Sequence, residues 1–233
     1  MKKVIFTVIV FVCSLAGVKA QEFSVGADLV SSYVWRGSLG AGTSIQPAAS
    51  LEYNGLTVGA WGSVDIASAG TKEVDFFAGY SACGASFTIT DYWWNGEGVQ
   101  KYFNYDSHNE LGHRFEASVG YTLPVEKFPL SLKWNTFFTG YDNYTVKEGE
   151  LKRSYSTYIE ATYPFSVKEI GLEAALGLTP WEGLYASEFS VINLSLKAKK
   201  DIKITDSFSL PVFGQIITNP RSEDIFFVFG ITL

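Results

Sequence analysis

Apolar and polar residues alternate with a period of two along most of the chain after its first twenty residues. Between residues 114 and 121, for example, the odd positions are apolar, whereas the even positions, beginning with Arg114 and Glu116, are polar or small. This period predicts β-strands that have one apolar and one polar face. No stretch beyond the first twenty residues shows the 3.6-residue period of an amphipathic helix.

The alternation predicts about twelve strands of roughly ten residues, the length that crosses a membrane at a tilt. We place these strands at residues 23–35, 44–53, 56–66, 73–81, 85–94, 110–122, 129–140, 152–164, 169–178, 188–199, 208–218 and 224–233. Without an apolar helix, the structure that can span a membrane is a closed barrel, in which every backbone group pairs with a neighbouring strand. We therefore expect an all-β fold, a transmembrane antiparallel up-and-down barrel.

The connections between these strands alternate in length. The even-numbered connections are short and include Asn54-Gly55, a pair of residues typical of tight hairpins. The odd-numbered ones include the long polar stretches 95–109 and 142–151. Outer-membrane barrels have this arrangement of short periplasmic turns and longer outer loops. A soluble β-sandwich or lipocalin-like barrel also alternates, but it does not require this pattern of connections.

Aromatic residues, 16% of the chain, gather near the predicted strand ends. Girdles of aromatic residues at both interfaces are typical of membrane barrels. We place Trp35, Trp93, Trp94, Tyr141 and Trp181 in an outer girdle. The opposite girdle would hold Tyr53, Tyr80, Tyr121, Tyr163 and Phe165.

Residues 1–20 have the pattern of a cleaved signal peptide. Lys2 and Lys3 precede a short apolar run, and Val18-Lys19-Ala20 offers a cleavage site after Ala20. Cleavage leaves one domain, residues 21–233, of 213 residues (233 minus 20). Loss of the three lysines changes the net charge from −6 to −9, which argues against nucleic acid as a partner.

The N-terminal third carries three short motifs in a fixed order. They are Ser31-Ser32-Tyr33-Val34-Trp35-Arg36-Gly37, then Gln46-Pro47-Ala48, then Gly55 followed by Gly59-Ala60-Trp61-Gly62-Ser63. In this order they resemble a family of uncharacterised bacterial outer-membrane barrels labelled Gcw_chp. The resemblance implies an outer-membrane barrel and brings no established activity.

If the apolar face of each strand meets lipid, the opposite face lines the lumen. Ionisable residues at bilayer depth must face an interior that solvates or pairs them. The candidates for lining the lumen are Asp28, Glu52, Asp65, Asp75, Arg114, Glu116, Lys133, Glu160, Glu173 and Lys197. An open lumen rich in acids favours cations or polar solutes. Alternatively, these charges pair across the interior and fill a narrow barrel.

Arg36 follows the first predicted strand, and we assign it to the outer rim. There its guanidinium could bind lipopolysaccharide phosphates in bidentate fashion. It could also fold into the lumen, or bind a loop carbonyl beside Gly37.

The sequence offers no pattern typical of an enzyme. The histidines, His108 and His113, lie near Asp106 and Glu110 with a spacing that matches no established metal-ligand pattern. Neither histidine has the serine two residues later that outer-membrane lipases use. Phosphate-binding glycine motifs and dinucleotide fingerprints are also absent from the sequence. We therefore expect no catalytic residues, no metal and no cofactor.

These observations favour a passive channel or facilitator for a small polar or cationic solute in the bacterial outer membrane. The expected partners are outer-membrane lipid and lipopolysaccharide, with a small polar solute for a channel. The alternative is a non-transporting barrel with a plugged lumen and a structural or adhesive role. A lipid-modifying enzyme is a third hypothesis.

Overall fold

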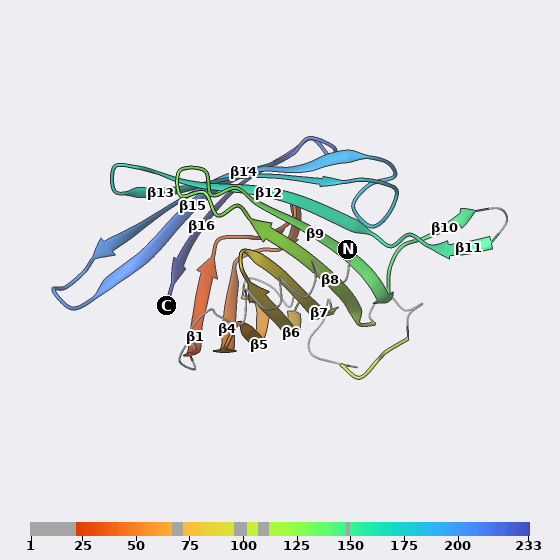
Figure 1. The fold of residues 1–233 in the computed structure, drawn as a ribbon, viewed down its shortest axis with the longest axis horizontal. Helices are drawn as coiled ribbons and strands as arrows, with labels where there is room; N and C mark the ends of the chain where they lie inside the picture. Colours follow the sequence, from red (N-terminus) through yellow and green to blue (C-terminus); the bar gives the residue numbers. More distant parts are fainter. Residues whose placement is uncertain (1–21, 67–71, 96–101, 107–111, 148–149) are drawn as a thin grey trace, which may run out of the picture.

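The computed structural model describes residues 22–66, 72–95, 102–106, 112–147 and 150–233. The expected signal peptide, residues 1–20, lies outside these ranges. Twelve strands form one ring (Figure 1). They are β1 (Glu22–Val30), β4 (Ser44–Tyr53), β5 (Leu56–Asp65), β6 (Lys72–Ala82), β7 (Ala85–Asn95), β8 (Arg114–Thr122), β9 (Ser131–Gly140), β12 (Thr157–Val167), β13 (Ile170–Thr179), β14 (Ser190–Lys203), β15 (Ser209–Asn219) and β16 (Asp224–Thr232).

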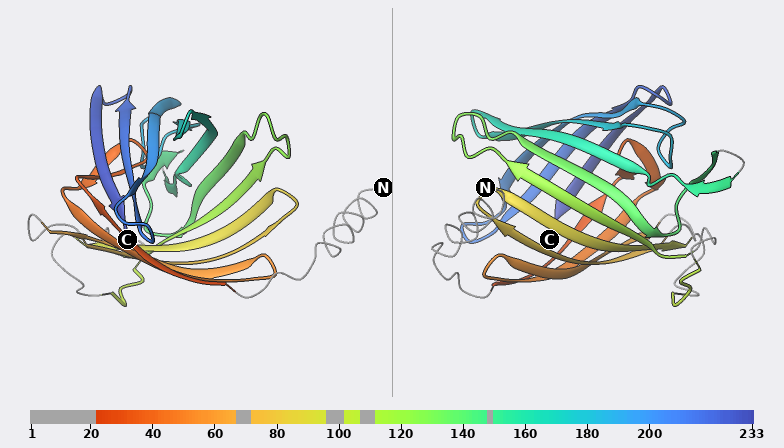
Figure 2. Two further views of the ribbon diagram at one scale, coloured as in Figure 1. Left: turned by 90° about the vertical axis from the view of Figure 1, so that its left-hand side faces the viewer. Right: turned by 45° about the vertical axis from the view of Figure 1, so that its right-hand side comes forward.

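The ring is a closed antiparallel barrel, as the alternation predicts. Each strand pairs with the strand before and after it in the ring, and β1 closes the ring by pairing with β16 (Figure 2). The strand containing Pro211 and Gly214 is present as β15. The fold class is therefore confirmed as a twelve-stranded all-β barrel.

The two ends of the barrel differ in their connections. At one end, which we call the turn end, short turns such as Asn54-Gly55 and Cys83-Gly84 join the strands. Both residues of each of these turns have positive φ, the conformation of the tight type I′ hairpin. At the other end, the loop end, most connections are longer. The predicted alternation of short and long connections is present, apart from two short connections at the loop end, residues 66–71 between β5 and β6 and residues 220–223 between β15 and β16.

Two short hairpins lie outside the ring of strands. β10 (Tyr144–Lys147) and β11 (Glu150–Arg153) extend beyond the loop end (Figure 1). β2 (Tyr33–Trp35) and β3 (Ser38–Ala41) follow β1 and pair only with each other. Three predicted strands were too long: the first ends at Val30, the sixth begins at Arg114 rather than at residue 110, and the eighth begins at Thr157 rather than at residue 152.

The outward face of the barrel is apolar around the whole ring. Each strand exposes at least one large apolar side chain: Phe23, Ile45, Val58, Phe76, Ile89, Val119, Leu132, Phe165, Leu176, Leu196, Ile216 and Phe227. Many buried side chains are instead polar, among them Ser63, Glu116 and Asn135. This distribution is the reverse of that in a soluble domain. Among the described residues, no helix is long and apolar enough to span a membrane.

Candidate functional site in the barrel lumen

A tight turn places Arg36 at the tip of the hairpin formed by β2 and β3. Trp35 and Ser38 pair on either side of the turn, and Arg36 and Gly37 have φ angles of 51° and 79°. Glycine adopts this conformation readily, whereas a residue with a side chain loses about 1–3 kcal/mol. Such a conformation persists only where surrounding contacts hold it, and Arg36 has many.

Arg36 lies inside the barrel, so its assignment to the outer rim was wrong. Its side chain is only 10% exposed and forms a bidentate ion pair with Glu116 of β8, which is 1% exposed. Nη1 lies 2.6 Å from Oε2 of Glu116, and Nη2 lies 2.8 Å from Oε1. The chain leaves the sheet after Val30 and carries Arg36 into the lumen, where it is not available to lipopolysaccharide phosphates.

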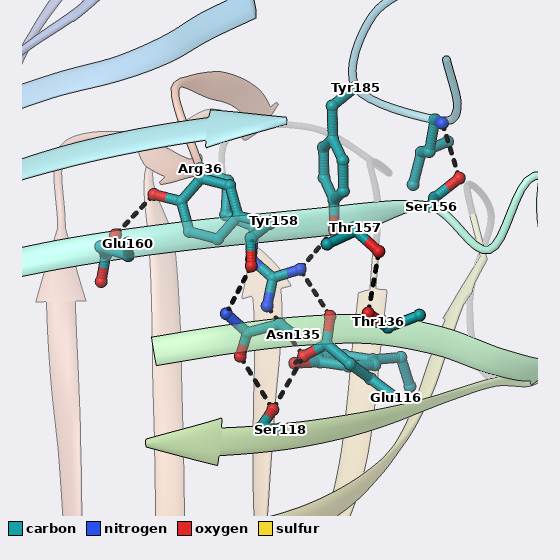
Figure 3. A network of polar contacts seen from close by, with 12 residues as sticks. Arg36, Glu116, Ser118, Asn135, Thr136, Ser156, Thr157, Tyr158, Glu160 and Tyr185 are labelled. Atoms are coloured by element: carbon teal, nitrogen blue, oxygen red, sulfur yellow. Dashed lines mark hydrogen bonds and ion pairs between the residues drawn. The ribbon is translucent and has the colours of Figure 1, made fainter. Parts of the chain in front are cut away.

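Aromatic rings surround the guanidinium of Arg36 (Figure 3). Its central carbon lies 4.3 Å from the ring centroid of Trp35, 4.7 Å from that of Tyr158 and 5.6 Å from that of Tyr185. Nη1 also donates a hydrogen bond to the hydroxyl of Tyr185. Burial raises the pKa of Tyr185, a loop residue, well above its ordinary value, so its hydroxyl stays protonated. A desolvated cation among rings is stabilised by cation–π attraction.

Glu116 belongs to a wider polar network on the lumen face of four strands, β7, β8, β9 and β12 (Figure 3). It accepts a hydrogen bond from the Tyr92 hydroxyl at 3.1 Å and one from Ser118 at 3.4 Å. Ser118 also donates to Asn135 at 2.8 Å, and Asn135 in turn donates to the backbone carbonyl of Tyr158. Buried polar groups are costly unless they are hydrogen-bonded, and this network satisfies most of them.

The turn of the hairpin also contacts the far side of the ring. Asn219 of β15 donates a hydrogen bond to the carbonyl oxygen of Gly37 at 3.2 Å. A Cβ atom at Gly37 would collide with the carbonyl of Ile192 in β14. The hairpin therefore reaches β8, β12, β14 and β15 at once and crosses the lumen. We call Trp35, Arg36, Glu116, Tyr158 and Tyr185 the central plug.

Loop contacts hold Tyr185 in place from the loop end. The backbone amide of Leu184 donates to Ser156 Oγ at 2.7 Å, and Ser156 Oγ donates to buried Asp142 at 2.5 Å. Asn143 donates to the carbonyl of Gly183 at 3.2 Å. These hydrogen bonds join the loop after β9 to the loop after β13, and so they hold the segment that carries Tyr185.

The turn side of the central plug opens into a polar cavity of about 360 Å³, which we call the inner chamber. Four residues predicted to line the lumen border it, and they face one another across strands: Lys133 opposite Glu160, and Glu173 opposite Lys197. Glu160 accepts a hydrogen bond from the Tyr158 hydroxyl at 2.5 Å. The lining of the inner chamber thus carries both positive and negative charges.

The loop side of the central plug borders a second cavity of about 360 Å³, the outer chamber. Its lining is mainly aromatic and apolar: Tyr33, Trp35, Ser38, Leu39, Gly40, Glu73, Trp94, Leu184 and Tyr185. Trp35 borders both cavities. The central plug is therefore a single layer of side chains between two chambers of similar size.

The other residues predicted to line the lumen are spread along its length. Asp65 accepts a hydrogen bond from the backbone of Gly42 at 3.2 Å, at the end of the hairpin segment. Asp28 accepts one from Thr232 at 2.6 Å, where β1 meets β16. Glu52 lies near the turn end and borders neither chamber.

Asp75 and Arg114 lie deeper in the loop half of the barrel, and both are buried. Arg114 places its guanidinium 3.8 Å from the ring centroid of Trp94. Asp75 follows Glu73 by two residues on the same face of β6, and its Oδ1 has no hydrogen-bond partner among the described atoms.

Sequence reasoning did not find several residues that build the site. Trp35 and Trp94, predicted in an outer girdle, lie inside the barrel, and Trp93 is fully buried. Glu73 was not among the residues predicted to line the lumen, although it lies two positions before Asp75 in β6 and so shares its face. Tyr158 likewise lies two positions before Glu160 in β12 and shares its face. Tyr185 lies in a loop without periodicity, and no pattern in the sequence identifies it.

His113 faces away from the lumen. Its Nδ1 lies 2.7 Å from Oδ1 of Asp91, and its Nε2 contacts the carbonyl of Tyr102. His108 and Glu110 lie outside the described residues. Within the described ranges, no group of three or more His, Cys, Asp or Glu residues could hold a metal ion.

The fold and the site define a class: a closed twelve-stranded antiparallel barrel whose lumen is crossed by its own N-terminal hairpin. A family model described as a bacterial protein of unknown function (Gcw_chp) matches residues 16–210. The chain belongs to this family, as the motifs of the N-terminal third indicated. The family description names no activity.

Among solved structures, the chain is similar to BamA from Haemophilus ducreyi lacking POTRA domains 1-3, with a TM-score of 0.38 and 10% identity. The match covers 85% of this chain and 41% of that chain, so this protein spans about two fifths of its length. No curated protein matches the chain.

Proposed function

We propose that the protein is an outer-membrane barrel that is closed at rest, and that a small polar solute crosses it only when the central plug shifts. The observation that carries this proposal is the pair of chambers, each of about 360 Å³, on the two sides of one layer of side chains. A barrel filled only for stability has no need of two cavities in series.

Location in a membrane is supported by the outward face. All twelve strands expose large apolar side chains there, and Phe23 and Val25 are each 71% exposed. Water-soluble monomers rarely leave an apolar surface of this extent uncovered. The turn end would face the periplasm, because short turns lie on that side in bacterial outer-membrane barrels.

A freely open pore does not fit the geometry at the centre of the lumen. The ion pair between Arg36 and Glu116 is bidentate and buried, and rings cover the guanidinium. Breaking such a pair by moving one partner costs several kcal/mol, unless a solute or a new contact compensates the exposed charge. A solute that carries its own charge or hydrogen-bonding groups could supply this compensation.

Liposome and planar-bilayer measurements test the proposal. The wild type should show low steady conductance but saturable uptake of a small polar solute. A variant with residues 32–42 replaced by a short Gly-Ser linker should conduct continuously, because the hairpin no longer crosses the lumen. The outward-facing substitution Leu132→Val should behave as the wild type. Large steady conductance of the wild type would contradict closure at rest, and absence of uptake for every solute would contradict transport.

A second candidate function is a non-transporting barrel that acts through its loops. The hairpin of β10 and β11 favours it, because this hairpin extends beyond the loop end (Figure 1). In that case, cells in which a short linker replaces residues 144–153 should behave like cells that lack the protein. Cells in which residues 32–42 are replaced should behave like the wild type. Opposite outcomes of the two replacements are expected for a transporting barrel.

A further inference from the structure

We propose that the outer chamber is a binding site for a small organic cation with a compact alkylated ammonium group, such as choline. The inference rests on the proposed function for the route through the barrel and deepens it by naming the class of solute. It stands on three observations: a chamber of suitable size, an arrangement of aromatic rings, and a buried excess of carboxylates.

The aromatic rings of the outer chamber come from three separate parts of the fold. Tyr33 and Trp35 lie on β2, Trp94 lies on β7, and Tyr185 lies in the loop after β13. The centroids of Trp35 and Trp94 are 6.0 Å apart with a 61° angle between planes, and those of Trp35 and Tyr185 are 5.9 Å apart at 50°. Rings at such angles form a corner. Aromatic corners of this kind recognise quaternary ammonium groups through cation–π attraction.

The charges around the outer chamber favour a cation. Glu73 borders the chamber and is only 5% exposed, and the Tyr33 hydroxyl donates a hydrogen bond to it. Asp75 lies beside Glu73 on the same face of β6 and has a buried oxygen without a hydrogen-bond partner among the described atoms. Arg114 is the nearby cation, while Arg36 is neutralised by Glu116. Apart from the ion pair of the plug, the described charged groups around the chamber are thus two carboxyl groups and one guanidinium.

The same lining argues against a sugar or a bare metal ion. A sugar stacks on a flat aromatic platform and needs several hydrogen-bonding side chains, whereas this chamber offers angled rings and two leucines, Leu39 and Leu184. A hard metal ion needs several oxygen ligands, and among the described lining residues only Glu73 contributes a carboxylate. An alkylated ammonium requires neither, because its attraction to rings and to one carboxylate is not directional.

Equilibrium binding to the folded wild type in detergent micelles tests the inference. Isothermal titration calorimetry would compare choline and tetramethylammonium with glucose and with the uncharged tert-butyl analogue of choline. Tryptophan fluorescence would report on Trp35 and Trp94 in the chamber. We expect saturable binding of the two cations only. Equal binding of the tert-butyl analogue would show that charge is not recognised, and preferential binding of glucose would identify a sugar site; either result overturns the inference.

Two matched substitutions locate the site. Glu73→Gln removes the chamber's carboxylate charge and should weaken choline binding about tenfold. Glu173→Gln makes the same change in the inner chamber and should leave the affinity unchanged. The opposite pattern would overturn the assignment to the outer chamber. Heat-modifiable migration in SDS gels would verify folding, and if Glu73→Gln fails to fold, the ligand series on the wild type still decides.

The inference and the proposed function can fail separately. Choline binding without uptake of any solute into liposomes would overturn the transport proposal and support the site. Saturable uptake of another solute, together with no binding of choline or tetramethylammonium, would overturn the site and leave the transport proposal in place.

Discussion

The central plug and the inner chamber contain the same kinds of charged residue in two different arrangements. In the plug, Arg36 and Glu116 are in direct contact, with the closest atoms 2.6 Å apart and both side chains buried. In the inner chamber, Lys133 and Glu160 are cross-strand neighbours, yet they form no ion pair among the described contacts. Both pairs face the lumen, and only the pair of Arg36 and Glu116 belongs to the central plug.

The difference shows how aromatic rings around a charged group determine whether that group forms a close ion pair or stays solvated. Rings of Trp35, Tyr158 and Tyr185 exclude water from the guanidinium of Arg36, so its pairing with Glu116 has to be close. In the inner chamber, Lys133 is exposed and Glu173 is half-buried, so water can solvate them. Buried charges stabilise or destabilise the fold strongly, whereas solvated ones mainly set the local potential.

The largest expected effect is that of Glu116→Gln. The substitution keeps the shape of the side chain but leaves Arg36 buried without a counter-charge, which costs about 3 kcal/mol or more. The free energy of unfolding, measured by denaturant titration in lipid vesicles, should fall by that amount. Glu173→Gln, in the inner chamber, should stay within about 0.5 kcal/mol of the wild type. Equal losses in the two variants would erase the distinction between plug and chamber.

Gly37→Ala should have the second largest effect. A methyl group there meets the carbonyl of Ile192, and the positive φ of 79° disfavours alanine. We expect a loss of about 1–3 kcal/mol in the free energy of unfolding, together with raised conductance because the hairpin is displaced. The matched control is Gly171→Ala, where the nearest atom lies at an ordinary 3.9 Å and little change is expected. An unchanged Gly37→Ala variant would mean that the hairpin can move freely.

Tyr158→Phe should have a smaller effect, because it keeps the ring beside Arg36 and removes only the hydroxyl. That hydroxyl donates to Glu160 and accepts a hydrogen bond from Asn193 at 2.9 Å. Its loss should lower the free energy of unfolding by about 1 kcal/mol. Tyr121→Phe is the control, since Tyr121 is an exposed tyrosine at the turn end of the barrel. A similar loss in both variants would show that the network around Glu160 adds no stability.

The smallest effect on stability is expected for Lys197→Gln, within about 0.5 kcal/mol, because its ammonium lies in the inner chamber over the Phe213 ring. Its effect should appear in selectivity instead. In the variant that lacks residues 32–42, removal of this positive charge should raise the preference for cations, measured as reversal potential in a salt gradient. No shift in reversal potential would indicate that the permeation path avoids the inner chamber.

Most of the barrel could be predicted from alternation, because each strand separates an apolar exterior from a polar interior. Two of the errors in strand bounds, in the first and the eighth strand, have one cause. Alternation continues through Tyr33 and Trp35, and again through residues 152–153, although the chain has already left the barrel sheet at both places. A period of two indicates an extended chain with two faces, and it does not indicate which sheet the chain joins.

The site was predicted in part, because alternation gives the face of a residue but not its depth or its partner. Glu116 and Lys133 both belong to the lumen set, yet nothing in the sequence separates a residue of the plug from a residue of the chamber. The position of Arg36 depends on a hairpin turn that folds inward, and that of Tyr185 depends on loop contacts through Leu184 and Ser156. Both positions depend on tertiary contacts, which leave no periodic pattern in the sequence.

The seam between β1 and β16 sets an order for assembly. It consists of three residue pairs, Asp28 to Thr232 through Val30 to Gly230, extended by the backbone bonds between Ala27 and Leu233. Contacts between residues so distant along the chain bear the largest loop-closure entropy and form late in folding. Arg36 follows Val30 by six residues, and its partners lie within the ring. We therefore expect the hairpin to be in place before the last strand docks, so that the barrel closes around its own plug.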